Sequence, residues 1–117
     1  MPSYQEADYG SLRLSKVVDG NGADPTQNFR FDLQLYTENQ TLEEKLKGTS
    51  TYGDVTFTDG KGMVYLEHGE SVTLSGIPAG VNWEIAETPT DGYTTAISGG
   101  TPVEGKSNTV TGKITKD

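Results

Sequence analysis

The segment NFRFDLQLY at residues 28–36 alternates apolar and polar side chains along its whole length. In a β-strand, successive side chains point to opposite faces of the sheet, so every second residue shares a face. One face of this segment is then apolar and the other is polar, which predicts a strand with one buried face. The residues on the apolar face are Phe29, Phe31, Leu33 and Leu35.

Shorter runs with the same alternation occur on both sides of this segment and are separated by turn sequences such as DGKG and EHGES. About seven strands at a spacing of roughly 8–12 residues are typical of a sandwich of two packed sheets. The sequence therefore predicts an all-β domain. Besides residues 28–36, the expected strands lie near 11–18, 53–58, 62–67, 71–75, 81–87, 93–97 and 108–116.

One segment, TENQTLEEKLKG at residues 37–48, has a helical rather than a strand-like pattern. Leu42 and Leu46 are four residues apart and would share one face of a helix, and Gly48 is suited to end it. We expect either one short helical insertion or an irregular loop here.

The length of 117 residues is that of a single domain. We assign residues 11–117 to this domain and residues 1–10 to a polar extension or linker. The extension lacks the basic and apolar regions of a signal peptide, and we expect the domain to be part of a longer chain.

Charge and composition exclude several classes of partner and chemistry. Seventeen acidic and nine basic residues give a net charge of −8, which disfavours nucleic acid as a partner. No apolar run is long enough to cross a bilayer, so we expect no membrane insertion of this domain. The absence of cysteine removes disulfides and thiolate chemistry.

Metal, cofactor and enzyme signals are weak. Asp19, Asn21 and Asp24 in DGNGAD resemble part of a calcium loop but lack its glycine placement and distant glutamate, so a solvated turn is the better interpretation. His68 is the only histidine, and no phosphate-binding loop or nucleophile elbow is present. We expect no metal, no cofactor and no enzyme activity beyond, at most, a single-turnover reaction of the chain with itself.

Two of the expected inner faces each carry an ionisable residue. Lys16 shares a face with Leu12, Leu14 and Val18, and Glu87 shares a face with Trp83 and other apolar residues. A buried charge is costly unless it is paired, neutralised or exposed through a snorkelling side chain. Either the two residues form an ion pair, or their charged tips reach water, or a neutral Lys16 amine attacks an Asn or Asp while Glu87 shuttles the proton.

The order and spacing of several segments resemble the B-type repeat domains of collagen-adhesin and pilin-like surface proteins of Gram-positive bacteria. These segments are GSLRLSKVVDGNGADPTQNFRFDLQL and the stretch from YGDVTFTDG to ETPTDGYTT, with the turn GIPAG inside it. The resemblance covers residues 10–97. It implies an immunoglobulin-like β-sandwich that serves as a stalk or spacer module in an extracellular, cell-wall-attached surface protein.

The resemblance also implies an intramolecular isopeptide bond between a first-strand lysine and a last-strand Asn or Asp, assisted by an acid from an intermediate strand. Lys16 matches the lysine by its place in LRLSK, and Glu87 matches the acid by its place before TPTDGY. The acceptor departs from the family pattern, because the usual Asn position near the end of the chain holds Lys116. Asn108 is our first candidate acceptor and Asp117 the second, unless the acceptor lies beyond this chain or the bond is lost.

We therefore predict a structural stalk or spacer module of a surface adhesin or pilus protein, whose partners are the neighbouring domains of the same protein. The alternative is an adhesin module that binds a host protein or glycan through an exposed face. A contiguous exposed aromatic or apolar patch would favour that alternative.

Overall fold

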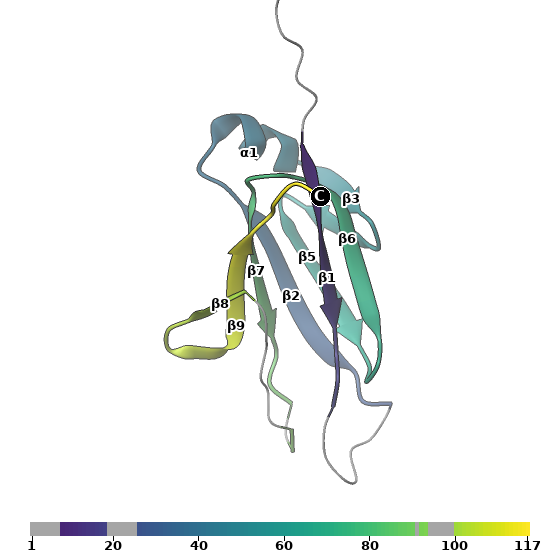
Figure 1. The fold of residues 1–117 in the computed structure, drawn as a ribbon. Coiled ribbons are helices and arrows are strands. Elements are labelled where there is room, and N and C mark those ends of the chain that lie inside the picture. The colour runs from purple at the N-terminus through teal and green to yellow at the C-terminus, as the bar shows by residue number, and fades with distance from the viewer. Residues whose placement is uncertain (1–7, 19–25, 91, 94–99) are drawn as a thin grey trace, which may run out of the picture.

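The computed structural model describes residues 8–18, 26–90, 92–93 and 100–117 of the chain. These residues form nine strands and one short helix, and Figure 1 shows them as an elongated sandwich. The elements are β1 (Tyr9–Ser15), β2 (Phe29–Tyr36), α1 (Gln40–Leu46), β3 (Thr49–Tyr52), β4 (Val55–Thr58), β5 (Lys61–Leu66), β6 (Ser71–Pro78), β7 (Asn82–Glu87), β8 (Thr101–Val103) and β9 (Lys106–Lys113).

Two sheets make up the sandwich, and every strand pair in them is antiparallel. The larger sheet has the order β3-β4-β5-β2-β7-β9-β8, and the smaller one contains β1 and β6. Figure 1 shows β1 and β6 lying over the centre of the larger sheet. The first strand thus lies across the core from the middle strands of the larger sheet.

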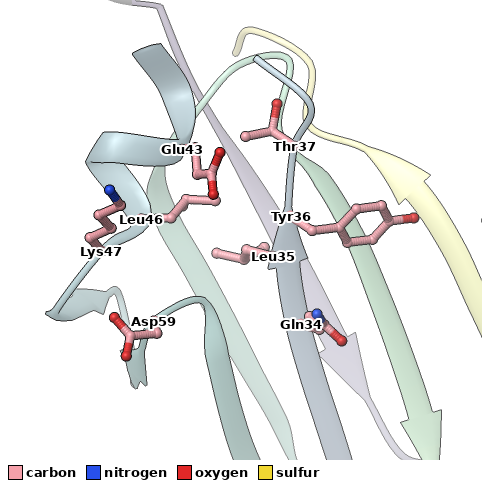
Figure 2. Close-up of a pocket in the computed structure, with 8 residues that line it drawn as sticks. All are labelled: Gln34, Leu35, Tyr36, Thr37, Glu43, Leu46, Lys47 and Asp59. Carbon is pink, nitrogen blue, oxygen red and sulfur yellow. The ribbon is translucent and has the colours of Figure 1, made fainter. Parts of the chain in front are cut away.

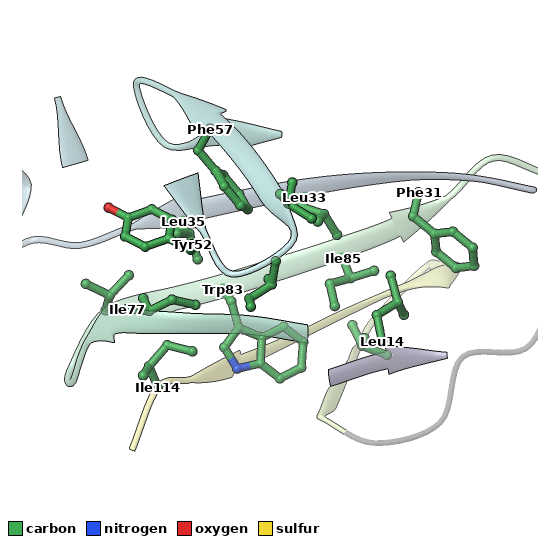
Figure 3. Packing of buried hydrophobic residues seen from close by; sticks show 14 of the residues in the cluster. Leu14, Phe31, Leu33, Leu35, Tyr52, Phe57, Ile77, Trp83, Ile85 and Ile114 are labelled. Carbon is green, nitrogen blue, oxygen red and sulfur yellow. The ribbon is translucent and has the colours of Figure 1, made fainter. Parts of the chain in front are cut away.

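The core lies between the sheets and is built from the predicted inner faces. Phe31, Leu33 and Leu35 of β2 are buried, as are Trp83 and Ile85 of β7. Figure 3 shows these side chains meeting Leu14 and Ile77 of the smaller sheet. The alternation read from residues 28–36 is confirmed, since every second residue of β2 is buried.

The predicted all-β class with one short helical insertion is confirmed. Helix α1 occupies the centre of residues 37–48 and begins after Asn39, whose side chain accepts a hydrogen bond from the Leu42 N–H at 3.0 Å. Strands β3 and β8 were not predicted. Residues 94–97 of the expected strand YTTAI and the calcium-like loop at residues 19–24 lie outside the described residues.

The two sheets are also joined by polar contacts at their edges. Asp54, in the turn between β3 and β4, donates its backbone N–H to the Thr73 carbonyl of β6 at 3.0 Å. Its side-chain Oδ2 accepts the Thr73 N–H, also at 3.0 Å. The β3–β4 turn therefore covers part of the edge of β6 and links it to the larger sheet.

The segment after β9 runs to the beginning of β1, at the same end of the sandwich as α1 (Figure 1). The Asp117 N–H donates to the Tyr9 carbonyl at 3.0 Å, and Thr115 lies so close to Gly10 that a Cβ there would collide with its carbonyl oxygen. Among the described residues, no helix has the length and apolar character needed to cross a bilayer.

Candidate self-crosslinking site

Lys16 directly follows β1 and continues the inward-facing alternation of that strand. Leu14 and Lys16 are both buried, whereas Ser15 and Val17 are exposed. The Lys16 N–H donates to the Glu70 carbonyl at 3.0 Å, which extends the pairing of β1 with β6 by one residue. The backbone thus directs the Lys16 side chain into the core.

The Lys16 ammonium meets the Glu87 carboxylate inside the sandwich. The distance from Nζ to Oε2 is 2.7 Å, and only 8% of Lys16 and 1% of Glu87 are exposed. Nζ also lies 4.4 Å from the centroid of the Phe29 ring, and that ring makes an edge contact with Tyr93. Of the interpretations from sequence, burial of both residues favours the ion pair or the reactive pair over solvated charged tips.

Asn108 lies beside Glu87 on the neighbouring strand. Ala86 of β7 is paired with Thr109 of β9, so the antiparallel register places Asn108 next to Glu87. Its side-chain Nδ2 donates to the Glu87 backbone carbonyl at 2.6 Å, and its side chain is partly buried. The first candidate acceptor is therefore at the same end of the sandwich as Lys16 and Glu87.

Lys116 and Asp117, the other two positions compared with the family's acceptor, lie at the end of the sandwich opposite Lys16. Asp117 Oδ2 accepts a hydrogen bond from Ser11 Oγ at 2.8 Å, and the Lys116 ammonium lies 3.3 Å from the exposed Asp8 carboxylate. Ser11 is five residues before Lys16, which corresponds to about 16 Å along a strand. The structure does not bring Asp117 or Lys116 to Lys16.

This arrangement has the three groups that amide formation needs. Lys16 supplies an amine, Asn108 supplies a carboxamide, and Glu87 contacts one through its side chain and the other through its backbone. Every buried side-chain nitrogen or oxygen in the described part of the chain has a hydrogen-bond partner. The two groups that Glu87 contacts are thus an amine and a carboxamide of the same chain.

Two contacts near Lys16 were not predicted from the sequence. His68 is exposed, and its Nδ1 accepts the Val18 N–H at 2.8 Å. Gly69 donates its N–H to the Lys16 carbonyl at 2.7 Å. Neither contact has a local signal, because each joins residues about fifty positions apart. Within the described residues, no group of three or more acidic, histidine or cysteine side chains could hold a metal ion.

A separate cleft of 460 Å³ lies between α1 and the end of β2 (Figure 2). Its floor contains Leu35 and Leu46, and the Tyr36 ring points away from the helix. At its edge, the hydrogen bond and charge of Glu44 raise the pKa of Lys47 above its usual value, with smaller contributions from nearby carboxylates. Lys47 forms an exposed ion pair with Glu44 at 2.8 Å, and Asp59 Oδ1 accepts the Gly48 N–H at 2.8 Å.

Comparison with known proteins places the chain in a family. Residues 10–117 match a domain family described as a domain of unknown function, DUF7601. The chain belongs to this family. The matched region covers every described strand from the second residue of β1 onwards.

A curated relative and two solved structures are pilus adhesins. The pilus tip adhesin Cpa of Streptococcus pyogenes is 34% identical over 97 residues, which are 81% of this chain and 14% of that protein. One crystal structure of the pilus-presented adhesin Cpa has a TM-score of 0.67 and 34% identity, covering 90% of this chain and 24% of that one. Another has a TM-score of 0.65 and 29% identity, covering 92% and 24%.

These matches confirm the resemblance to pilin-like surface domains of Gram-positive bacteria that the sequence indicated. They also agree with the β-sandwich class. The chain spans only 14% of the length of the curated relative.

Proposed function

We propose that this domain is a structural stalk or spacer module of a surface adhesin or pilus protein, stabilised by an amide bond that Lys16 and Asn108 form without an enzyme. The observation that carries the proposal is the buried Lys16–Glu87 pair with Asn108 beside it. The relationship to pilus adhesins supports an extracellular, cell-wall-attached location.

The proposed reaction begins with proton transfer from the Lys16 ammonium to the Glu87 carboxylate along their 2.7 Å hydrogen bond. This transfer leaves a neutral amine on Lys16 and a neutral carboxylic acid on Glu87. The amine nitrogen then attacks Cγ of Asn108, while the Glu87 carboxyl group donates a proton to the amide oxygen. A carbon–nitrogen bond to Lys16 forms, the bond to Nδ2 breaks, and Nδ2 leaves as ammonia with protons returned through Glu87.

The surface supports a spacer rather than a binding module. Five large hydrophobic residues are exposed in the described part of the chain, but they are scattered. Met63 and Tyr65 neighbour each other on β5, while Tyr36 is at the far end of β2, and Tyr9 and Val17 lie near opposite ends of β1. A contiguous apolar patch, which a docking face for a host protein or glycan would need, is not formed by these residues.

The proposed partners follow from this assignment. A spacer contacts the neighbouring domains of its own protein, and it turns over no external substrate. The net charge of −8 gives no attraction to nucleic acid.

Intact mass spectrometry of the denatured, purified chain tests the crosslink. We expect a mass lower than the calculated one by one ammonia, and a branched Lys16–Asn108 peptide after proteolysis. Lys16→Ala, Asn108→Ala and Glu87→Ala should each have the full calculated mass.

The controls assign any loss to these residues. Ammonia loss that persists in Lys16→Ala would come from another site, such as succinimide formation at an Asn-Gly pair. Loss of one water would indicate an aspartate acceptor. The full mass in the unsubstituted chain would contradict the crosslink and leave Lys16 and Glu87 as an ion pair.

A further inference from the structure

The turn between β5 and β6, residues 67–70, forms hydrogen bonds with the backbone at the end of β1, next to the buried Lys16–Glu87 pair. The Lys16 N–H donates to the Glu70 carbonyl and the Lys16 carbonyl accepts the Gly69 N–H, at 3.0 and 2.7 Å. The Glu70 carboxylate accepts the Glu67 N–H at 2.6 Å, which closes the turn on itself. Both backbone hydrogen-bonding groups of Lys16 are therefore fixed by this turn.

His68, in the same turn, extends this hold by two residues. Its Nδ1 accepts the Val18 N–H at 2.8 Å, beyond the last residue of β1. The ring is exposed, and it is the only imidazole in the chain. Lys16 is thus clamped between the ladder of β1 with β6 on one side and the Val18–His68 bond on the other.

The Val18–His68 bond depends on the protonation state of the ring. Nδ1 can accept a hydrogen bond only while it carries a lone pair, and protonation turns it into a donor facing another donor. Histidine is the side chain that normally titrates between about pH 5 and 8. Protonation of the His68 ring therefore removes this hydrogen bond.

The surrounding charges do not replace this bond. The turn itself contributes the carboxylates of Glu67 and Glu70, which would attract an imidazolium. The Val18 N–H donates to His68, and the Glu70 carboxylate accepts the Glu67 N–H instead. On β1, the Arg13 guanidinium donates to Ser71 Oγ, and the Lys16 ammonium points inward to Glu87. Among the described residues, these are the charged groups of the turn and of the strand packed against it.

We propose that His68 is a positioning residue for Lys16, and that protonation of its imidazole loosens the end of β1 and slows the attack of Lys16 on Asn108. The inference rests on the proposed self-crosslinking reaction. Attack requires the amine to be held close to Cγ, and looser positioning lowers the rate. Loss of one hydrogen bond that aids this positioning corresponds to a rate change of about twofold to tenfold.

Two substitutions of His68 separate the effect of having a hydrogen-bond acceptor for Val18 from the effect of protonating the ring. His68→Asn places an amide oxygen close to the position of Nδ1, so it keeps an acceptor for Val18 that does not change with pH. His68→Ala removes the acceptor at every pH. The starting material is denatured chain recovered from inclusion bodies, whose full mass shows that it has not yet reacted. The reaction is started by diluting this chain from denaturant into buffers between pH 5.5 and 8.

We expect the ammonia-loss rate of the unsubstituted chain to fall by about twofold to tenfold more between pH 8 and 5.5 than that of His68→Asn. His68→Ala should be slow across the range. Any pH effect of the Lys16–Glu87 pair is common to all three chains and cancels in this comparison. Equal pH profiles for the unsubstituted chain and His68→Asn, or an unchanged rate in His68→Ala, would overturn the proposal.

Amide hydrogen exchange of Val18, followed by NMR, tests the clamp independently of the reaction. Protection should be lost in acid in the unsubstituted chain, kept in His68→Asn and absent in His68→Ala. If no chain loses ammonia but Val18 shows this pattern, the crosslink is wrong and the His68 clamp is correct. If Val18 is equally protected in all three chains, the clamp is wrong whether or not the crosslink forms.

Discussion

At the scale of single residues, the buried charge pair is the most demanding feature of the domain. Removing one partner of such a pair leaves an uncompensated buried charge, whereas replacing both by apolar side chains of similar size is far less costly. Glu87 is almost completely buried, and Lys16 makes its ion pair in the same interior. The stability of the domain should therefore depend on the two residues jointly.

We expect Lys16→Met and Glu87→Met each to lower the free energy of unfolding by about 3–5 kcal/mol, and the double variant to lose less than the sum. Urea unfolding checks this, with all chains carrying Asn108→Ala so that no crosslink to that residue contributes. Changes below about 0.5 kcal/mol in both single variants would mean that the charged tips are solvated.

At the scale of elements, the edge contact between the β3–β4 turn and β6 joins the two sheets. The Asp54 carboxylate accepts the Thr73 N–H across that contact, whereas Asp32 on β2 pairs with Arg30 on an exposed face. Asp54→Ala and Asp32→Ala remove the same charge from these two environments and so form a matched pair.

We expect Asp54→Ala to lower the free energy of unfolding by about 1 kcal/mol, since a backbone donor loses its partner. Asp32→Ala should cost close to zero, as is usual for an exposed ion pair. Urea unfolding and amide exchange at Thr73 provide the measurements. An equal cost for the two variants would show that the Asp54 carboxylate adds nothing to the link between the sheets, which would then rest on the backbone bond to Thr73.

The elements also show what the sequence could predict and what it could not. The inner faces of β1, β2 and β7 could be read because a period of two is a local property. Strands β3 and β8 lack that signal, since TSTY has one large apolar residue and TPV is three residues long with a central proline. The inward orientation of Lys16 and Glu87 could be predicted from the local alternation of each strand. Their pairing could not, because it depends on how strands that are distant in the sequence lie across the core. Asn108 could be placed in phase with the inner face, but only the β7–β9 register brings it beside Glu87.

At the scale of the whole molecule, a Lys16–Asn108 bond would close about 90 residues into one covalent loop. Such a loop restricts the unfolded chain as a long-loop disulfide does, for which the entropic model gives about 4–5 kcal/mol. It would also change how the domain carries a load, because force applied at the two ends would bypass the loop. The cysteine-free domain would gain in this way the covalent closure that many extracellular domains take from disulfides.

Single-molecule pulling between the two ends of the chain measures this bypass. In the unsubstituted domain, only the residues before Lys16 and after Asn108 can be extended. The Asn108→Ala variant should release the loop as well and lengthen by roughly 300 Å more when it unfolds, at about 3.3–3.6 Å per residue. Asn108→Asp, which can form the same amide with loss of water, should remain short like the unsubstituted chain. Full extension of the unsubstituted domain would show that force runs through the folded sandwich, whose stability then rests on the Lys16–Glu87 pair and the packed core alone.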